Sequence, residues 1–193
     1  MARASSESIL FERIRAALAG ASMRVWVRDV VADDASYRDR IVRLIDGIVP
    51  ASRLVVHGRP DLAEEIGAGV HFAARAAAVI SPPGRWVSRA VHDHDELIRA
   101  EASGATTLVV GTVFETPSKP GRETLGVGGL GRLCRQANRP VYAIGGIDET
   151  NARAVVEAGA HGVAVCGAIM GAEEPAAVAA RIAGIVGSTA SSG

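Results

Sequence analysis

Three stretches of the sequence repeat one pattern, in which a helix tail meets a Gly-Ala turn and then a short apolar run. They are residues 64–72, 101–111 and 156–167. The glycine of each turn stands where a helix would end, a place that favours the left-handed backbone glycine adopts readily. The apolar runs are hydrophobic at odd and even positions alike, which is typical of strands buried on both faces. Strands of this kind alternating with helices predict a parallel sheet.

The same pattern predicts seven strands, at residues 24–28, 54–56, 69–72, 86–91, 107–113, 141–144 and 162–166. It predicts seven helices, at residues 6–19, 36–48, 61–66, 93–102, 125–137, 149–158 and 175–186. This order is that of a TIM-type (β/α)8 barrel without its first strand, because the chain starts on a helix. We expect the resulting seam to be closed by its two edge strands, by a neighbouring chain, or by a strand encoded upstream.

Length and charge limit the protein further. The 193 residues fit a single barrel domain over 1–193, with a small-residue tail at 187–193 that we expect to be disordered. The 21 Lys and Arg residues balance 21 Asp and Glu residues, which argues against a nucleic acid or a membrane surface as partner. Cys134 and Cys166 offer neither a disulfide framework nor a metal site, and no leader or apolar span is apparent. We therefore expect a cytoplasmic protein.

Two small-residue turns are candidates for binding a phosphate. Gly145 and Gly146 follow the strand at 141–144, and Gly167 and Ala168 follow the strand at 162–166. In β/α barrels a phosphate commonly binds at the loops after the last two strands, where backbone N–H groups converge. The alternative is that these glycines only relieve crowding at tight turns.

A long loop after the strand at 107–113 carries a second set of candidates, Thr116, Ser118 and Lys119. Two hydroxyl groups and an ammonium group suit a phosphate, although the same composition is typical of a solvated Pro/Gly loop. His57 and His71 follow or lie in strands and could line the mouth of the barrel, or could be structural histidines. Cys166 is expected to be a buried small hydrophobic residue.

Several stretches together resemble thiamine phosphate synthase and its relative TenI. The resemblance extends over about residues 8–186 and rests on residues 27–29, 56–63, 69–71, 91–92, 95–96, 111–116, 118–119, 143–147 and 162–165. It implies a β/α barrel that binds the small molecule thiazole phosphate. It also implies phosphate or substrate contacts from Arg28, Thr116, Ser118, Lys119, Gly145, Gly146, Gly167 and Ala168.

Other positions depart from the family pattern. The two Mg²⁺-binding aspartates of the synthase fall on Gly58 and Ala76, and the catalytic histidine of TenI falls on Thr112. The family's residues that flank the arginine matched by Arg28 fall on Trp26 and Val30. A pyrophosphate-contacting serine of the family falls on Ala90. We therefore expect no metal site and no cofactor, with Mg²⁺ needed only by a synthase.

These departures lead us to expect first a TenI-like thiazole tautomerase, with His57, His71 and Thr112 as catalytic candidates. One alternative is a thiamine phosphate synthase that joins hydroxymethylpyrimidine pyrophosphate to thiazole phosphate. A third interpretation is a non-catalytic phosphate-binding partner of the thiamine pathway. Assembly into a homo-oligomer is left open.

Overall fold

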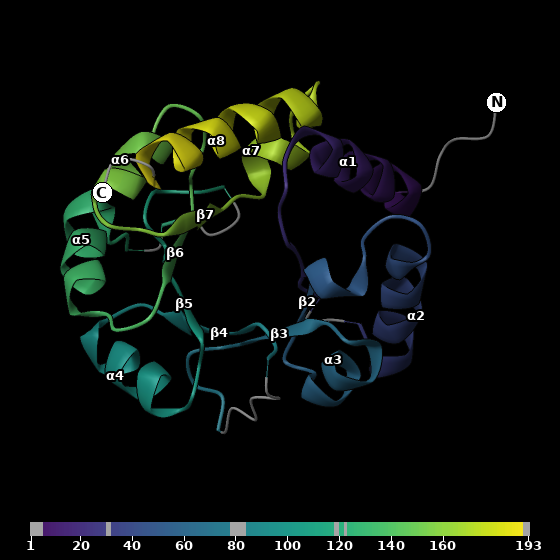
Figure 1. The fold of residues 1–193 in the computed structure, drawn as a ribbon, viewed down its shortest axis with the longest axis horizontal. Coiled ribbons are helices and arrows are strands. Elements are labelled where there is room, and N and C mark those ends of the chain that lie inside the picture. The colour runs from purple at the N-terminus through teal and green to yellow at the C-terminus, as the bar shows by residue number, and fades with distance from the viewer. Residues whose placement is uncertain (1–5, 30–31, 78–83, 118–119, 122, 191–193) are drawn as a thin grey trace.

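A computed structural model describes residues 6–29, 32–77, 84–117, 120–121 and 123–190. Seven parallel strands form one sheet in which spatial order follows chain order (Figure 1). They are β1 (Val25–Val27), β2 (Leu54–His57), β3 (Gly69–Phe72), β4 (Val87–Val91), β5 (Thr107–Gly111), β6 (Val141–Ile144) and β7 (Gly162–Ala164). The sheet curls into an incomplete TIM-like barrel, as the alternation of buried strands and helices predicted.

Helices surround the curled sheet on its outer side (Figure 1). They are α1 (Ser6–Gly20), α2 (Asp34–Ile45), the 3-10 turn η1 (Ala51–Arg53), α3 (Pro60–Ile66), α4 (His94–Ala102), α5 (Gly126–Gln136), α6 (Ala152–Glu157), α7 (Gly167–Met170) and α8 (Pro175–Ala190). No helix in the described ranges is long and apolar enough to cross a membrane.

The barrel has an open seam. Within the described residues β1 pairs only with β2, and β7 pairs only with β6. The expectation that the two edge strands might pair with each other is therefore wrong. Closure by another chain or by an upstream strand stays a prediction.

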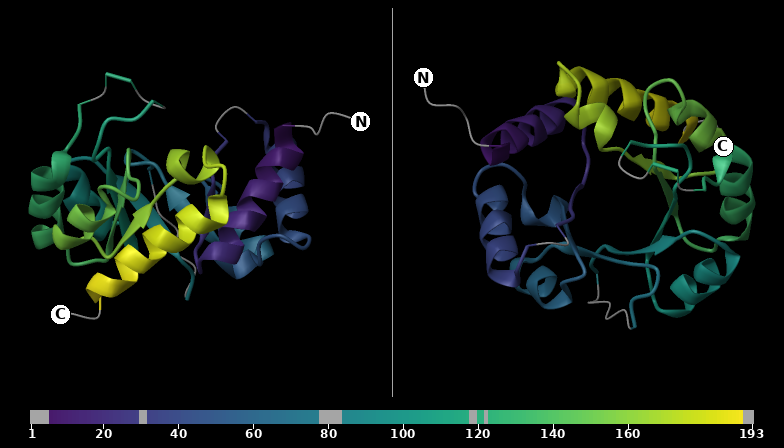
Figure 2. Two further views of the ribbon diagram at one scale, coloured as in Figure 1. Left: turned by 90° about the horizontal axis from the view of Figure 1, so that it is seen from above. Right: turned by 180° about the vertical axis from the view of Figure 1, so that it is seen from behind.

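Helices bridge this seam from outside. Figures 1 and 2 show α1, in purple, lying beside α7 and α8, in yellow-green and yellow. A Cβ atom at Gly20 would overlap the carbonyl oxygen of Ala176, so only glycine permits this approach of the backbones. Arg13 Nη1 donates to the carbonyl of Ala172 at 2.6 Å. The first and last helices thus hold the two sides of the barrel together.

The core lies between the strands and the helices. Val56 of β2, Val70 of β3 and Val87 of β4 belong to one buried cluster, together with Tyr37 of α2. Because side chains alternate along a strand, the intervening residues point to the inside of the barrel. His57 and His71 are among these alternate residues, so the interior carries imidazole groups where the outer layer is apolar.

Several element boundaries differ from the predictions. Helix α2 begins at Asp34, because Asp33 caps it by accepting a hydrogen bond from Ser36 N at 2.9 Å. Strand β5 ends at Gly111, two residues before the predicted end. Helix α6 begins at Ala152, after a turn in which Asn151 Oδ1 accepts from Asp148 N at 3.0 Å.

The chain after β7 also differs. Cys166 is exposed, whereas we expected it to be buried, because β7 ends at Ala164 and the short helix α7 begins directly after Cys166. Helix α8 continues to Ala190, into the segment that we expected to be disordered. The remaining residues of that tail, 191–193, lie outside the described residues.

Candidate active site

The predicted site residues lie at the carboxyl ends of the strands, in two groups. The first group, on β1 to β3, consists of Arg28, His57 and His71; the second, after β5 to β7, consists of Thr112, Thr116, Gly145, Gly146, Gly167 and Ala168. Ser118 and Lys119, like Val30, lie outside the described residues. In a barrel the loops at these strand ends carry the chemistry.

The turn after β6 is packed against the loop that follows β5. Val113 N donates to Ile144 O and Phe114 N donates to Gly145 O, both at 3.0 Å. Gly146 has a φ of 65°, and a Cβ atom there would overlap Glu115 O and lie 2.8 Å from Phe114 Cβ. Glycine at positions 145 and 146 thus avoids an overlap between the two loops. Ligand binding by the same turn stays a prediction.

Thr112 belongs to this packing. Its side chain is buried, and a Cβ atom at Gly145 would lie 3.0 Å from Thr112 Cα. Its carbonyl accepts from Leu125 N at 2.9 Å. The structure therefore gives Thr112 a packing position beneath the turn, and its predicted catalytic role stays untested.

The turn after β7 is more open. The register that pairs Ile144 with Ala164 places it beside the turn after β6. Gly167 is exposed, and a Cβ atom there would meet nothing within 4 Å. Ala168 is half-buried in the first turn of α7. Backbone N–H groups of a first helical turn have no partner within the helix. The two predicted phosphate turns are therefore neighbours.

Trp26 and the two histidines of the first group gather inside the barrel. The rings of Trp26 and His71 have centroids 3.9 Å apart, and those of His57 and His71 are stacked at 5.5 Å. His71 is 2% exposed, and its Nδ1 shares a hydrogen bond with Ser88 Oγ at 2.9 Å. The Nδ1 atom of His57 and the Nε1 atom of Trp26 are buried without a hydrogen-bond partner in the described structure.

Burial keeps both imidazoles neutral. It lowers the pKa of His71 to about 3, with smaller contributions from His57 and from the positive charge of Arg28. Burial also lowers the pKa of His57, and the guanidinium groups of Arg28 and Arg59 add to that shift. His71 is therefore uncharged near neutral pH, and its predicted catalytic role stays a prediction.

We expect His71 to make the fold less stable in acid. An unfolded histidine titrates near 6.5, so at lower pH the unfolded chain binds a proton that the folded chain excludes down to about pH 3. The free energy of unfolding should fall by about 2 kcal/mol between about pH 8 and pH 5. Urea unfolding of the wild type and of His71→Gln measures this contribution, which the variant should lack.

The exposed residue His161 provides the matched control. The variant His161→Gln should keep the wild-type dependence of stability on pH. An unchanged dependence in His71→Gln would show that His71 is not the group responsible.

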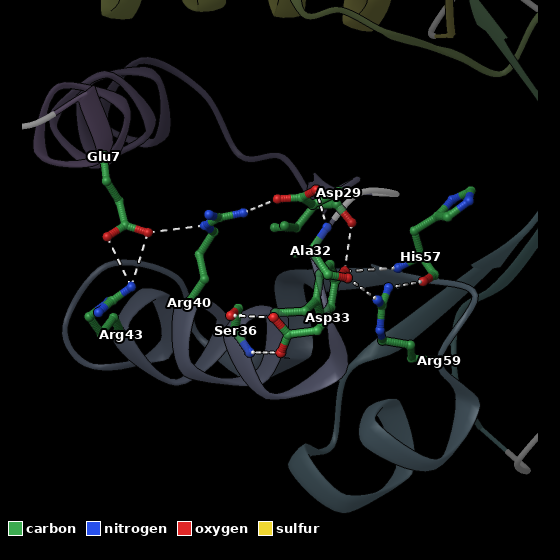
Figure 3. Close-up of polar contacts among 11 residues, drawn as sticks. Glu7, Asp29, Ala32, Asp33, Ser36, Arg40, Arg43, His57 and Arg59 are labelled. Atoms are coloured by element: carbon green, nitrogen blue, oxygen red, sulfur yellow. Dashed lines mark hydrogen bonds and ion pairs between the residues drawn. The ribbon is translucent and has the colours of Figure 1, made fainter.

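A frame of polar contacts holds the ends of β1 and β2 (Figure 3). The buried hydroxyl of Tyr37 donates to Val27 O at 2.7 Å and accepts from His57 N at 3.1 Å. Arg59 stacks on the Tyr37 ring at 3.9 Å and donates to the carbonyls of His57 and Ala32. Sequence reasoning missed Tyr37 and Arg59 as site residues, although Arg59 stands within the stretch 56–63 that carries the resemblance.

A second chain of contacts fixes the carboxylate beside Arg28. Asp29 accepts from Ala32 N at 3.0 Å and forms an ion pair with Arg40. Arg40 also bonds Glu7 of α1, 3.0 Å away (Figure 3). Asp29 therefore serves to anchor the loop after β1.

The first group does not fit Mg²⁺. That ion prefers carboxylate and other oxygen ligands. The side chains gathered at the ends of β1 to β3 are imidazoles, an indole and guanidinium groups, while Asp29 is bound by Arg40. No group of three or more potential metal ligands occurs among the described residues.

Known proteins resemble this chain over most of its length. A thiamine-phosphate synthase of Roseiflexus sp. is 35% identical, with the match covering 96% of this chain and 82% of that protein. Another from Gloeobacter violaceus is 39% identical over 86% of this chain, which matches only 51% of that longer protein. The chain thus spans most of one of these relatives and about half of the other.

Solved structures agree with these relatives. A thiamine phosphate pyrophosphorylase from Pyrococcus furiosus superposes with a TM-score of 0.75 at 27% identity, covering 93% of this chain and 90% of that one. A 3-hexulose-6-phosphate synthase shares the fold, with a TM-score of 0.69 at 18% identity and with 93% and 94% of the two chains covered.

The comparisons correct the functional expectation. A TenI-like tautomerase was expected first, yet relatives at 35–39% identity over most of the chain are named thiamine-phosphate synthase. The tautomerase interpretation is therefore wrong, and the same relatives speak against a non-catalytic partner. The prediction erred because it gave single replaced positions more weight than the similarity of the whole chain.

The family itself follows from the sequence match. Residues 2–169 match the protein family described as thiamine monophosphate synthase. The match extends over nearly the whole barrel and includes both groups of site residues up to α7. The chain belongs to the thiamine monophosphate synthase family.

Proposed function

We propose that this protein is a thiamine-phosphate synthase. The observation that carries the proposal is the identity of 35–39% with proteins of that name over most of the chain. The reaction joins hydroxymethylpyrimidine pyrophosphate to thiazole phosphate. The ring nitrogen of the thiazole supplies the electron pair of a new bond to the methylene carbon of the pyrimidine. The carbon–oxygen bond to pyrophosphate breaks, and its electron pair leaves on the pyrophosphate oxygen.

The two groups of residues suit the two substrates. The neighbouring turns after β6 and β7 would take the thiazole phosphate, with backbone N–H groups facing the anion. Arg28 would face the pyrophosphate, because it is exposed and has no hydrogen bond or ion pair within the described residues. A departing pyrophosphate carries several negative charges, which a fixed guanidinium stabilises.

We expect the purified protein to form thiamine phosphate and to release one pyrophosphate for each product molecule. Supplying both precursors and following both products by chromatography and a coupled pyrophosphate assay measures this turnover. Reactions without one precursor serve as controls. The absence of product from folded protein with both precursors present would contradict the proposal.

A further inference from the structure

We infer that His57 and Arg28 form a receptor for a pyrophosphate group that needs no divalent cation, and that binding of the anion places a proton on His57. The identity of the ligand rests on the proposed function. The inference goes further by assigning to a protein side chain the positive charge that a metal ion held by the family's two aspartates would otherwise provide; those aspartates are replaced here by Gly58 and Ala76.

Two groups at the mouth have an unmet capacity for hydrogen bonds. Arg28 lies at the end of β1, exposed, with no bond to another described residue. His57 ends β2, and its Nδ1 atom is buried without a partner in the described structure. The register that pairs Val27 with Val56 makes Arg28 and His57 the next residues along two neighbouring strands. An acceptor with several oxygens could bond both.

The charges that lower the pKa of His57 belong to two cations, Arg28 after β1 and Arg59 at the start of α3. His71 of β3 is neutral. Tyr37 of α2 contributes only its hydroxyl, which accepts from His57 N. Such surroundings attract a polyanion and repel Mg²⁺.

The carboxylates near this mouth are held by other arginines. Asp29 is paired with Arg40, and the exposed Asp34 lies 2.8 Å from Arg59 Nε. Figure 3 shows the imidazole of His57 extending away from these paired groups. The anchored acids thus shape the loops without offering a metal ligand next to His57.

Binding of an anion changes the protonation equilibrium of the His57 imidazole. In the free protein, burial and two nearby guanidinium groups hold the pKa of His57 below its usual range. A bound pyrophosphate offsets those positive charges and accepts a hydrogen bond from the protonated ring. The imidazole then takes up a proton from solvent, and affinity must rise as the pH falls.

The test is calorimetry with inorganic pyrophosphate in the presence of EDTA, repeated in buffers of different ionisation enthalpy. Near pH 6.5 we expect the wild type to take up about half a proton more per bound pyrophosphate than His57→Gln. The affinity of the variant should be about 10-fold lower at this pH and closer to wild type at about pH 8.5, where histidine stays neutral. The exposed His161→Gln is the control and should behave as the wild type.

Comparison with the variant removes the protons that pyrophosphate itself exchanges, because these are common to both titrations. Nitrogen NMR of the labelled imidazoles gives an independent reading, in which His57 should acquire the spectrum of a protonated ring when pyrophosphate is added. Circular dichroism checks that His57→Gln is folded. Should it not be, His57→Asn and the NMR titration of the wild type decide the question.

The outcomes separate this inference from the proposed function. Equal proton uptake by wild type and variant, or pyrophosphate binding that requires Mg²⁺, overturns the inference even if thiamine phosphate is formed. Proton uptake assigned to His57 without any formation of thiamine phosphate supports the receptor and overturns the synthase.

Discussion

Replacing Gly146 by alanine is expected to lower kcat/KM by about 100-fold, which corresponds to about 2.7 kcal/mol of lost transition-state stabilisation. The added Cβ atom would overlap Glu115 O and press on Phe114. Relieving the overlap moves either the turn after β6 or the loop after β5 away from its present position. Both carry predicted phosphate-binding groups, and a shift of about 1 Å can reduce catalysis by this amount. Steady-state kinetics with varied thiazole phosphate measures the effect.

Gly104 offers the matched control. It also has a positive φ, 84°, but a Cβ atom there meets nothing within 4 Å, and it lies between α4 and β5. Gly104→Ala introduces similar backbone strain, about 1 kcal/mol, without the overlap. It should lower stability slightly and leave kcat/KM unchanged. Equal loss of activity in both variants would show that backbone strain alone, and not the loop contact, explains the result.

The variant Arg28→Gln is expected to lower kcat/KM by about 30- to 150-fold, because a charge-assisted hydrogen bond contributes about 2–3 kcal/mol. The loss should appear when the pyrimidine pyrophosphate is varied and should be small in the KM for thiazole phosphate. Arg28→Lys should recover part of the activity, since the charge stays while the paired donors are lost. Kinetics with each substrate varied in turn provides both values.

Arg99→Gln is the control for Arg28, because Arg99 is exposed on α4. It should leave both KM values and kcat unchanged. Wild-type kinetics of Arg28→Gln for the pyrimidine substrate would show that Arg28 does not bind the pyrophosphate. The same result would speak against the pyrophosphate receptor.

The strands were the most predictable part of this fold. Strand β3 and strand β6 have exactly the predicted limits, because each is an apolar run bounded by a turn signal. Helix α2 was less predictable: Asp33 extends its start by side-chain capping. The short helix α7 was missed, since four residues of small and apolar type contain no periodic signal.

The site could be predicted only where residues adjacent in the sequence form it. The pair Gly145 and Gly146 predicts a tight turn from the sequence alone. The frame of Tyr37 and Arg59 could not be predicted, because it joins α2 to the end of β2 and the start of α3 across 20 or more residues. The low pKa of His71 depends in the same way on burial among residues from several strands.

The contact between α1 and α8 constrains the order in which the parts of the barrel can fold. Arg13 and Ala172, which it brings together, are 159 residues apart, whereas each strand pairs with the next strand along the chain. The entropy of closing a loop grows with its length, and contacts of long sequence separation slow folding. The sheet can therefore assemble by successive short closures, but the ring of helices closes only when nearly the whole chain is ordered. The edge strand β1, which Arg28 follows, depends on that final step for its position across the seam from β7.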